Sequence, residues 1–291
     1  MSSLRGNNGP RYRHTADESA PYETIEVDKL TPIIGAEIGG ADLSEALSNR
    51  QMDEIHRALA ENSVIFFRDQ HLTQDQHLAF GRNFGELHVH PAAPHAPGHP
   101  ELMIIHADKD SPRANGEGWH SDVSCDAEPP MGSILYIQQT PPKGGDTLFA
   151  SMYAAYEALS DRMKAYLEGL VAEHDGEDAY RGTYKTGQEK AVYPRAEHPV
   201  IRIHPVSRRK ALYVNRFFTT RIVQLSQRES DGLLAMLFSH IETPEFHCRF
   251  RWQPGSVAFW DNRCVQHHAM WDYFPQRRHG LRVTIKGDKP F

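Results

Sequence analysis

The chain has 291 residues, of which 39% are hydrophobic and 24% are charged, the composition of an ordinary globular protein. Its formal net charge of −6 lacks the basic excess that binding to a phosphate backbone requires, so nucleic acid is not expected as a partner. No apolar run reaches the ~20 residues that span a bilayer, and the three cysteines show no CxxC spacing, so we expect no membrane association and a reducing, cytoplasmic location.

The N-terminal third is predicted to mix strands and helices. Residues 1–21 are polar and are expected to form a flexible arm, while residues 22–291 are expected to form a single domain. Short strands are predicted at residues 22–30, 33–40 and 63–69. Helices are predicted at residues 49–62, from the helical spacing of apolar residues, and after Thr73, which forms a capping-box pattern with Gln76.

From residue 100 onward the pattern is typical of an antiparallel sandwich or barrel. Pro and Gly separate short apolar runs, which are predicted as strands at residues 101–107, 131–140, 146–151, 198–205, 211–216, 247–252, 256–261 and 281–287. Two helices are predicted among them, at residues 153–170 and 227–241. Residues 176–197 are polar and lack periodicity, so they are predicted to form a long loop, of a length typical of lids and binding loops.

A histidine and a carboxylate stand two residues apart in the segment GWHSDV. If residues 118–123 are extended, His120 and Asp122 point to one face and could serve as two metal ligands. A third ligand is expected from His267 or His268, which follow a predicted strand. Two imidazoles and one carboxylate form the facial triad of nonheme Fe(II) oxygenases, although a catalytic zinc accepts the same set. For the isolated motif, a surface turn or a hydrogen-bonded pair is the alternative.

The C-terminal segment offers two arginines for binding an anion. If the predicted strand at 281–287 extends back along the chain, Arg278 and Arg282 share one face, roughly 13 Å apart. A guanidinium is a natural bidentate partner for a carboxylate or a sulfur oxyanion. The alternative is that Arg277, Arg278 and Arg282 form a solvated sheet edge. The glycines of KGGDT are predicted to form a turn that delivers Thr147 onto a strand.

Several motifs together resemble one known family. WHSD, KGGDT, WDNRCVQHHA, PQRR and LRVTIKGDKP occur in the order and spacing of the taurine dioxygenase/TfdA family of Fe(II)- and 2-oxoglutarate-dependent dioxygenases. The resemblance runs from about residue 24 to the C-terminus and includes VIFFRDQ, FGELHVHPAAPH and FTTRIV. It implies a mostly β fold with flanking helices, namely a double-stranded β-helix or jelly-roll barrel.

The resemblance also implies roles for individual residues. The positions that match the iron ligands are His120, Asp122 and His267, the last preferred over His268 because it follows the WDNR and QH pattern. Thr147 and Arg278 match the residues that hold the far carboxylate of 2-oxoglutarate. His90 and Arg282 match residues that grip the substrate sulfonate.

Two aromatic residues are assigned to the substrate pocket with an alternative for each. Trp119, beside the first ligand, is expected to be a pocket wall, and core packing is its alternative. Tyr180 aligns near an aromatic lid position, and an exposed loop tyrosine is its alternative. The sequence departs from the taurine enzymes at Ala93, where they carry a tyrosine, and at Gly116, where they carry an asparagine. These departures predict a substrate other than taurine, and a bulkier one.

The resemblance implies that the protein hydroxylates a C–H bond of a small anionic substrate, using Fe(II), 2-oxoglutarate and O2. The first expectation is an organosulfonate or an alkyl sulfate ester, cleaved to an aldehyde with release of sulfite or sulfate. The alternatives are hydroxylation of an aryloxyalkanoate or an amino-acid-type carboxylate, a noncatalytic anion-binding barrel, and a zinc-dependent hydrolase. Amphipathic helices flanking an antiparallel barrel are also compatible with a homo-oligomer.

Overall fold

The computed structural model of the chain describes residues 20–90, 93–181 and 193–291. Almost all of the predicted arm at 1–21, and the middle of the predicted loop at 176–197, therefore lie outside the described residues. Within the described part of the chain, no helix is both long and apolar enough to cross a membrane.

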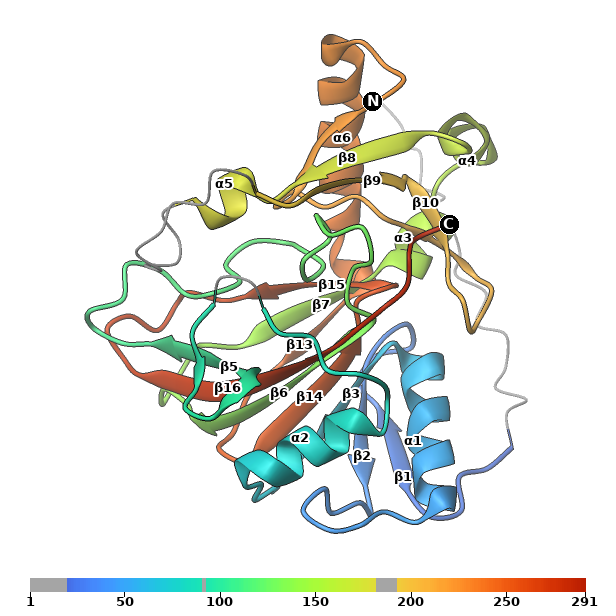
Figure 1. Cartoon of the computed structure of the whole chain (residues 1–291). Coiled ribbons are helices and arrows are strands. Elements are labelled where there is room, and N and C mark those ends of the chain that lie inside the picture. The colour runs from blue at the N-terminus through green and yellow to red at the C-terminus, as the bar shows by residue number, and fades with distance from the viewer. Residues whose placement is uncertain (1–19, 91–92, 182–192) are drawn as a thin grey trace, which may run out of the picture.

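An eight-stranded sheet forms the centre of the molecule (Figure 1). Its strands, in spatial order, are β1 (Glu26–Lys29), β2 (Ala36–Gly39), β3 (Val64–Phe67), β14 (Ser256–Asp261), β6 (Gly132–Gln139), β16 (Arg278–Ile285), β5 (His99–Ala107) and β4 (His95–Ala96). Neighbouring strands are antiparallel except for the parallel pair β2 and β3. Strands from both ends of the sequence thus meet in the middle of one sheet.

A second, three-stranded sheet packs against one face of the large sheet. Its strands, in spatial order, are β13 (His247–Phe250), β7 (Thr147–Ser151) and β15 (Val265–Ala269). The Phe66 ring of the large sheet lies 3.9 Å from the ring of Phe250 and 5.5 Å from that of Phe149, which come from this second sheet. The main apolar core therefore lies between the two sheets.

Two helices cover the opposite face of the large sheet, α1 (Asn49–Asn62) and α2 (Gln74–Arg82). Ile55, Leu59 and Phe80 of these helices share a second core with Ile65 and Phe67 of β3. Because β3 is covered on both faces, all four of its side chains are buried, which explains its continuous apolar run.

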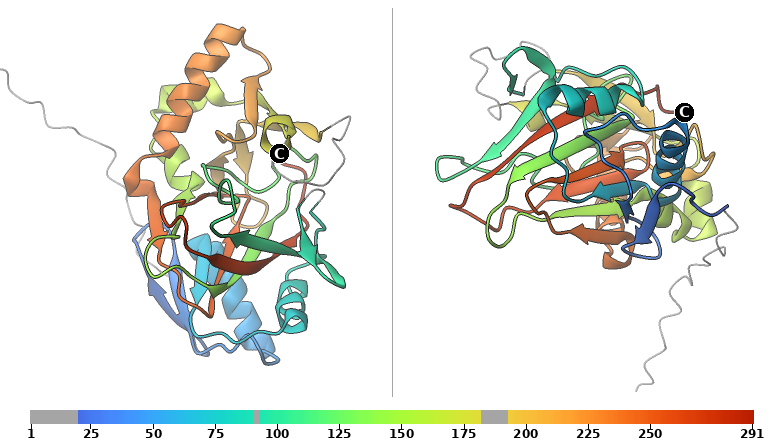
Figure 2. Two further views of the ribbon diagram at one scale, coloured as in Figure 1. Left: turned by 90° about the vertical axis from the view of Figure 1, so that its left-hand side faces the viewer. Right: turned by 90° about the horizontal axis from the view of Figure 1, so that it is seen from below.

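The remaining elements lie at the other end of the molecule from α1 and α2 (Figures 1 and 2). They comprise the sheet of β12 (Thr219–Ile222), β8 (Val171–Asp175) and β9 (Arg195–Pro199), the pair β10 (Ile201–Ile203) and β11 (Lys210–Leu212), and the helices α3 (Met152–Glu157), α4 (Asp161–Leu167), α5 (Glu177–Tyr180), α6 (Gln227–Ile241) and η1 (Pro244–Phe246). These elements carry part of the wall around the site described below.

The predicted helices at 49–62 and 227–241 are confirmed, and so is the capping box at Thr73. Ser226 and Glu229 form a further capping box at the start of the second of these helices. The single helix predicted at 153–170 is wrong, because Ser160 accepts a hydrogen bond from the Met163 N–H and caps a new helix there. The strand predicted at 198–205 is divided between β9 and β10.

The long loop predicted at 176–197 is wrong at both ends. It begins with the helical turn α5 and ends within β9, which pairs with β8. Residues 182–192, the middle of that segment, lie outside the described residues.

Candidate metal and cosubstrate site

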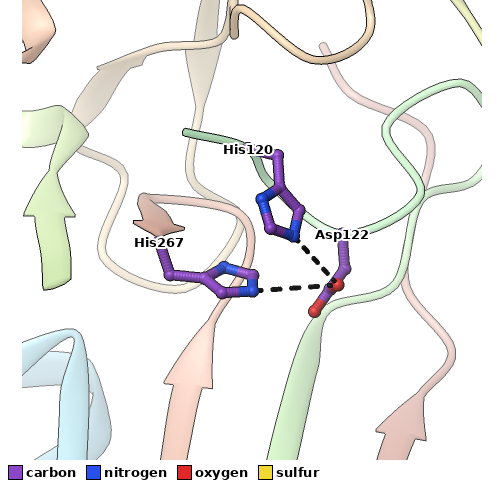
Figure 3. Close-up of side chains that lie close together, drawn as sticks. All are labelled: His120, Asp122 and His267. Atoms are coloured by element: carbon purple, nitrogen blue, oxygen red, sulfur yellow. Dashed lines mark ion pairs between the residues drawn. The ribbon is translucent and has the colours of Figure 1, made fainter. Parts of the chain in front are cut away.

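Three predicted metal ligands meet at one point (Figure 3). The Nε2 atoms of His120 and His267 lie 3.8 Å and 3.9 Å from the same oxygen, Oδ1 of Asp122. All three side chains are buried, at 5%, 6% and 3% exposure for His120, His267 and Asp122. Their ligand atoms lie within 4.8 Å of one another, which is close enough to share one ion.

Main-chain hydrogen bonds hold the two histidine residues side by side. The His120 N–H donates to the His267 carbonyl at 3.1 Å, and the His267 N–H donates to the His120 carbonyl at 2.8 Å. The extended strand predicted at 118–123 is wrong, because this bridge involves His120 alone and the chain turns at Asp122, where Val123 takes a φ of +48°. The turn, and not a strand, aims the carboxylate at the imidazoles.

Hydrogen bonds orient two of the three ligands, His120 and Asp122. The Nδ1–H of His120 is placed to donate to the Gly118 carbonyl at 2.9 Å, which leaves the lone pair of Nε2 facing the site. Ser133 Oγ donates to Oδ2 of Asp122 at 2.7 Å, and the Asp122 N–H donates to the side-chain oxygen of Asn262. Trp260 Nε1 donates to the same Asn262 oxygen at 2.9 Å, which fixes the amide.

The protonation states of the three groups suit metal binding. Burial lowers the pKa of His267 well below its usual value and also lowers the pKa of His120, so both imidazoles are neutral. Burial alone would raise the pKa of Asp122, but the positive charge of Arg282 and the hydrogen bond from Ser133 act in the opposite direction, and the net pKa is lowered. The site thus offers two neutral nitrogens and one carboxylate, the donor set of a facial triad.

His268 is not part of this group. It follows His267 on β15, so its side chain points to the other face, where its ring lies 5.6 Å from the Trp119 ring. Trp119 itself packs in the main core between His268 and His247, and it is not among the described side chains that line the cavity beside the ligands. The prediction of Trp119 as a pocket wall is therefore wrong, and core packing explains the residue.

Thr147 and Arg278 line the same cavity as the three ligands. The turn predicted in KGGDT is confirmed, since Gly144 and Gly145 have φ of 76° and 73° and β7 starts at Thr147. The Nε of Arg278 donates to the Gly145 carbonyl at 3.1 Å, while one terminal nitrogen of this buried guanidinium has no hydrogen-bond partner among the described residues. Such an orphaned donor fits a ligand carboxylate.

Trp252 is a site residue that the sequence reasoning missed. Its Nε1 donates to Thr147 Oγ1 at 2.9 Å, and the Arg278 guanidinium lies 5.4 Å from the centre of its ring. Trp252 is 105 residues from Thr147 in the sequence. No local pattern could have joined the two residues.

Arg282 is buried at 7% exposure and donates from one terminal nitrogen to Oδ1 of Asp122 at 2.6 Å. The alternative of a solvated sheet edge is wrong for Arg278 and Arg282, because β16 lies between β6 and β5 inside the sheet. Both arginines project from one face of this strand, as predicted.

His90 and Tyr180 lie side by side at the cavity wall. Their ring centres are 5.7 Å apart with the rings edge to face, and Nδ1 of His90 accepts a hydrogen bond from the Ala93 N–H at 2.9 Å. Tyr180 is 7% exposed, so the alternative of an exposed loop tyrosine is wrong. Its hydroxyl accepts a weak hydrogen bond from the Cys125 thiol.

The two departures from the taurine enzymes have different surroundings. Gly116 lines the cavity with a φ of +82°, and a Cβ there would lie 3.2 Å from Cε1 of His120. Ala93 is buried in the main core, which it shares with Met103. Sequence reasoning also gave no role to Phe217, whose ring lies 5.3 Å from the His120 ring and which lines the cavity.

A second group of potential ligands, His204, Asp261 and Cys264, is already saturated. Asp261 accepts two hydrogen bonds from the Arg263 guanidinium, at 2.8 Å and 2.6 Å, one from the Arg263 main-chain N–H at 2.9 Å, and one from His204 at 3.0 Å. Burial raises the pKa of the Cys264 thiol to about 12, which leaves it protonated. A guanidinium therefore stands where a cation would have to bind, and this group is structural.

Comparison with known proteins agrees with the geometry. The family model described as taurine catabolism dioxygenase TauD, TfdA family, matches residues 26–284. An alpha-ketoglutarate-dependent sulfonate dioxygenase of Saccharomyces cerevisiae is 35% identical over 280 residues, which cover 91% of this chain and 68% of that protein. An alpha-ketoglutarate-dependent sulfate ester dioxygenase of Pseudomonas putida is 36% identical over 284 residues, or 94% of this chain and 93% of that one.

A solved structure shares the fold. The crystal structure of a taurine dioxygenase from Burkholderia xenovorans superposes with a TM-score of 0.81 at 39% sequence identity, covering 92% of this chain and 91% of that chain. The mostly β architecture with flanking helices is thus common to both proteins.

Proposed function

Since the chain belongs to the taurine catabolism dioxygenase TauD, TfdA family, we propose that it is a Fe(II)- and 2-oxoglutarate-dependent dioxygenase acting on a small anionic substrate. The observation that carries this proposal is the convergence of His120, Asp122 and His267 on one point beside an orphaned, buried arginine. Two imidazoles and one carboxylate on one side of an ion leave coordination positions for a cosubstrate and for oxygen.

The residues divide between metal and cosubstrate. His120, Asp122 and His267 would hold the metal, and Thr147 and Arg278 would hold the far carboxylate of 2-oxoglutarate. When bound, the metal, 2-oxoglutarate and O2 would supply oxidative chemistry in which 2-oxoglutarate becomes succinate and CO2 and one oxygen atom enters a substrate C–H bond. Trp252 keeps the Thr147 hydroxyl in place, and Gly145 does the same for the arginine.

An organosulfonate or an alkyl sulfate ester is the proposed substrate class. Arg282 and His90 line the cavity near the ligands and would orient the anionic group, while Tyr180 and Phe217 would contact the organic part. Hydroxylation of the carbon that bears the sulfonate or the sulfate oxygen gives an unstable adduct, which breaks down to an aldehyde and sulfite or sulfate. The names of the relatives in yeast and Pseudomonas support this class over a carboxylate substrate.

The remaining proposals concern the whole chain. We propose that the two facing sheets are the halves of a jelly-roll barrel and that residues 22–291 form one catalytic domain. The negative net charge supports the absence of nucleic-acid binding, and the three buried, unpaired cysteines support a reducing cytoplasm. We propose no membrane association and an assembly into a homo-oligomer, which gel filtration tests.

The test is succinate formation by the purified protein with Fe(II), ascorbate, 2-oxoglutarate and O2. We expect turnover with alkanesulfonates or alkyl sulfates of several chain lengths, accompanied by stoichiometric sulfite or sulfate. Phenol release from aryloxyalkanoates, or hydroxylation of amino acids without cleavage, would assign the enzyme to the alternative substrate class. Hydrolysis that needs zinc and no O2, or no succinate with any anion, would contradict the proposal.

A further inference from the structure

Arg282 contacts a metal ligand and not only the cavity. Its terminal nitrogen donates to Oδ1 of Asp122 at 2.6 Å, and this is the oxygen that lies nearest to Nε2 of both histidines. The other carboxylate oxygen, Oδ2, is held by Ser133. We propose that Arg282 couples the metal centre to the substrate anion, because Asp122 neutralises this guanidinium until a metal takes over the carboxylate.

The charge arrangement around Arg282 supports this coupling. Its partners in register on the neighbouring strands are Met103 and Leu135, which are apolar. Asp122 is its only ion-pair partner among the described residues. A buried guanidinium with a single counter-ion binds a second anion poorly while that pair is intact.

A dication between the histidines and Asp122 changes this balance. It draws the charge of Asp122 toward itself, so the positive charge of Arg282 becomes available to an anion. The donor needed for this second partner is present, since Nε of Arg282 is buried and has no hydrogen-bond partner among the described residues. By linkage, anion binding must then strengthen metal binding by the same factor.

This inference rests on the proposed function, because it takes Arg282 as the residue that receives the substrate anion. It adds an order of binding to that function, in which the metal binds before the substrate. A sulfonate would bind weakly to the metal-free protein and more tightly once the metal is present, so the substrate would not occupy a site that is unable to react.

The test uses chelator-treated, metal-free protein and measures butane-1-sulfonate binding by titration calorimetry. Asp122→Asn removes the competing charge with little change in shape, and we expect it to bind the sulfonate about tenfold more tightly than the unmodified protein. Glu117→Gln is the matched control, because Glu117 also lines the cavity and the change removes one negative charge without touching Arg282. We expect its affinity to stay within about threefold of the unmodified protein.

Two results would overturn the coupling. One is an Asp122→Asn protein that binds the sulfonate no better than the unmodified chain, and the other is an equal gain in Glu117→Gln. If Asp122→Asn does not fold, the Mn(II) affinity of the unmodified protein is measured with and without saturating sulfonate. An increase of about tenfold that disappears in Arg282→Gln supports the coupling, while no increase, or an equal increase in Arg282→Gln, contradicts it.

These readouts separate the inference from the proposed function. They are equilibrium affinities and need no turnover. A protein that forms succinate from sulfonates but shows no coupling would retain the proposed function and lose only this role of Arg282.

Discussion

Thr147 and Arg278 project from strands of the two facing sheets, whereas His90, Gly116 and Tyr180 reach the same cavity from loops, a turn and one helical turn. Thr147 and Arg278, the strand-borne part of the cavity, are held by main-chain ladders and by the Trp252 hydrogen bond. His90, Gly116 and Tyr180, together with Phe217, form the loop-borne part, which is held by a few side-chain contacts. Binding of the cosubstrate is expected on the rigid part, and the choice of the organic part of the substrate on the part that can change without disturbing the sheets.

The largest effect is expected from loss of a metal ligand. His267→Ala should weaken Mn(II) binding by more than about 100-fold and abolish succinate formation, because the site loses one of two nitrogens. The matched control is His268→Ala, which removes the neighbouring imidazole on the other face of β15 and should leave the Mn(II) affinity within about threefold. Calorimetry gives both affinities, and a larger loss in His268→Ala than in His267→Ala would show that the wrong histidine had been assigned.

The next largest effect should separate the buried Arg278 from its exposed neighbour, Arg277. Arg278→Ala should raise the KM for 2-oxoglutarate by about 100-fold, because a buried charge that pairs with a carboxylate is removed. Arg277→Ala lies one residue away on the surface and should leave this KM unchanged. Steady-state assays at varied 2-oxoglutarate measure both, and a normal KM in Arg278→Ala would assign the cosubstrate carboxylate to another residue.

A smaller effect is expected from a change at Trp252, which contacts Thr147 but does not line the cavity among the described residues. Trp252→Phe keeps the aromatic ring but removes the hydrogen bond to Thr147, which should raise the KM for 2-oxoglutarate about fivefold. The substrate KM should not change, since Trp252 does not line the cavity among the described residues. If both KM values rise together, the tryptophan supports the fold as a whole and not the cosubstrate position.

The smallest effect concerns the loop-borne wall. Phe217→Leu removes the ring that lies beside His120, and we expect the KM for long-chain sulfonates to change about threefold while the KM for 2-oxoglutarate stays constant. A panel of sulfonates of increasing chain length measures the change. An effect on 2-oxoglutarate as large as that on the sulfonate would remove the division between the two parts of the cavity.

The sequence predicts most reliably what depends on near neighbours. The helices at 49–62 and 227–241 each begin at a capping box whose two residues lie three positions apart, and the structure has both helices at the predicted bounds. The break at Ser160 is also local, but the apolar spacing on its two sides continues and conceals it. Trp252 and Ser133 escape prediction because each acts on a residue in another strand or turn, which only the folded chain brings close.

The site shows the same division. The structure gathers all three residues that the resemblance names as metal ligands. Residues 118–123 are not extended, however, and Asp122 lies in a turn with hydrogen bonds to Asn262 and Ser133. Trp119 was assigned to the pocket because it adjoins His120 in sequence. Its ring lies in the core instead, beside the rings of His247 and His268.

The reciprocal backbone bridge between His120 and His267 has a practical consequence. Because main-chain hydrogen bonds set the spacing of the two imidazoles, the metal does not have to assemble the site from separate segments. The stripped protein should therefore keep its native circular dichroism and regain full activity within the mixing time when ferrous salt is returned. Reconstitution would then require only metal binding and no refolding, which sets this centre apart from small zinc domains that unfold when a chelator removes the metal.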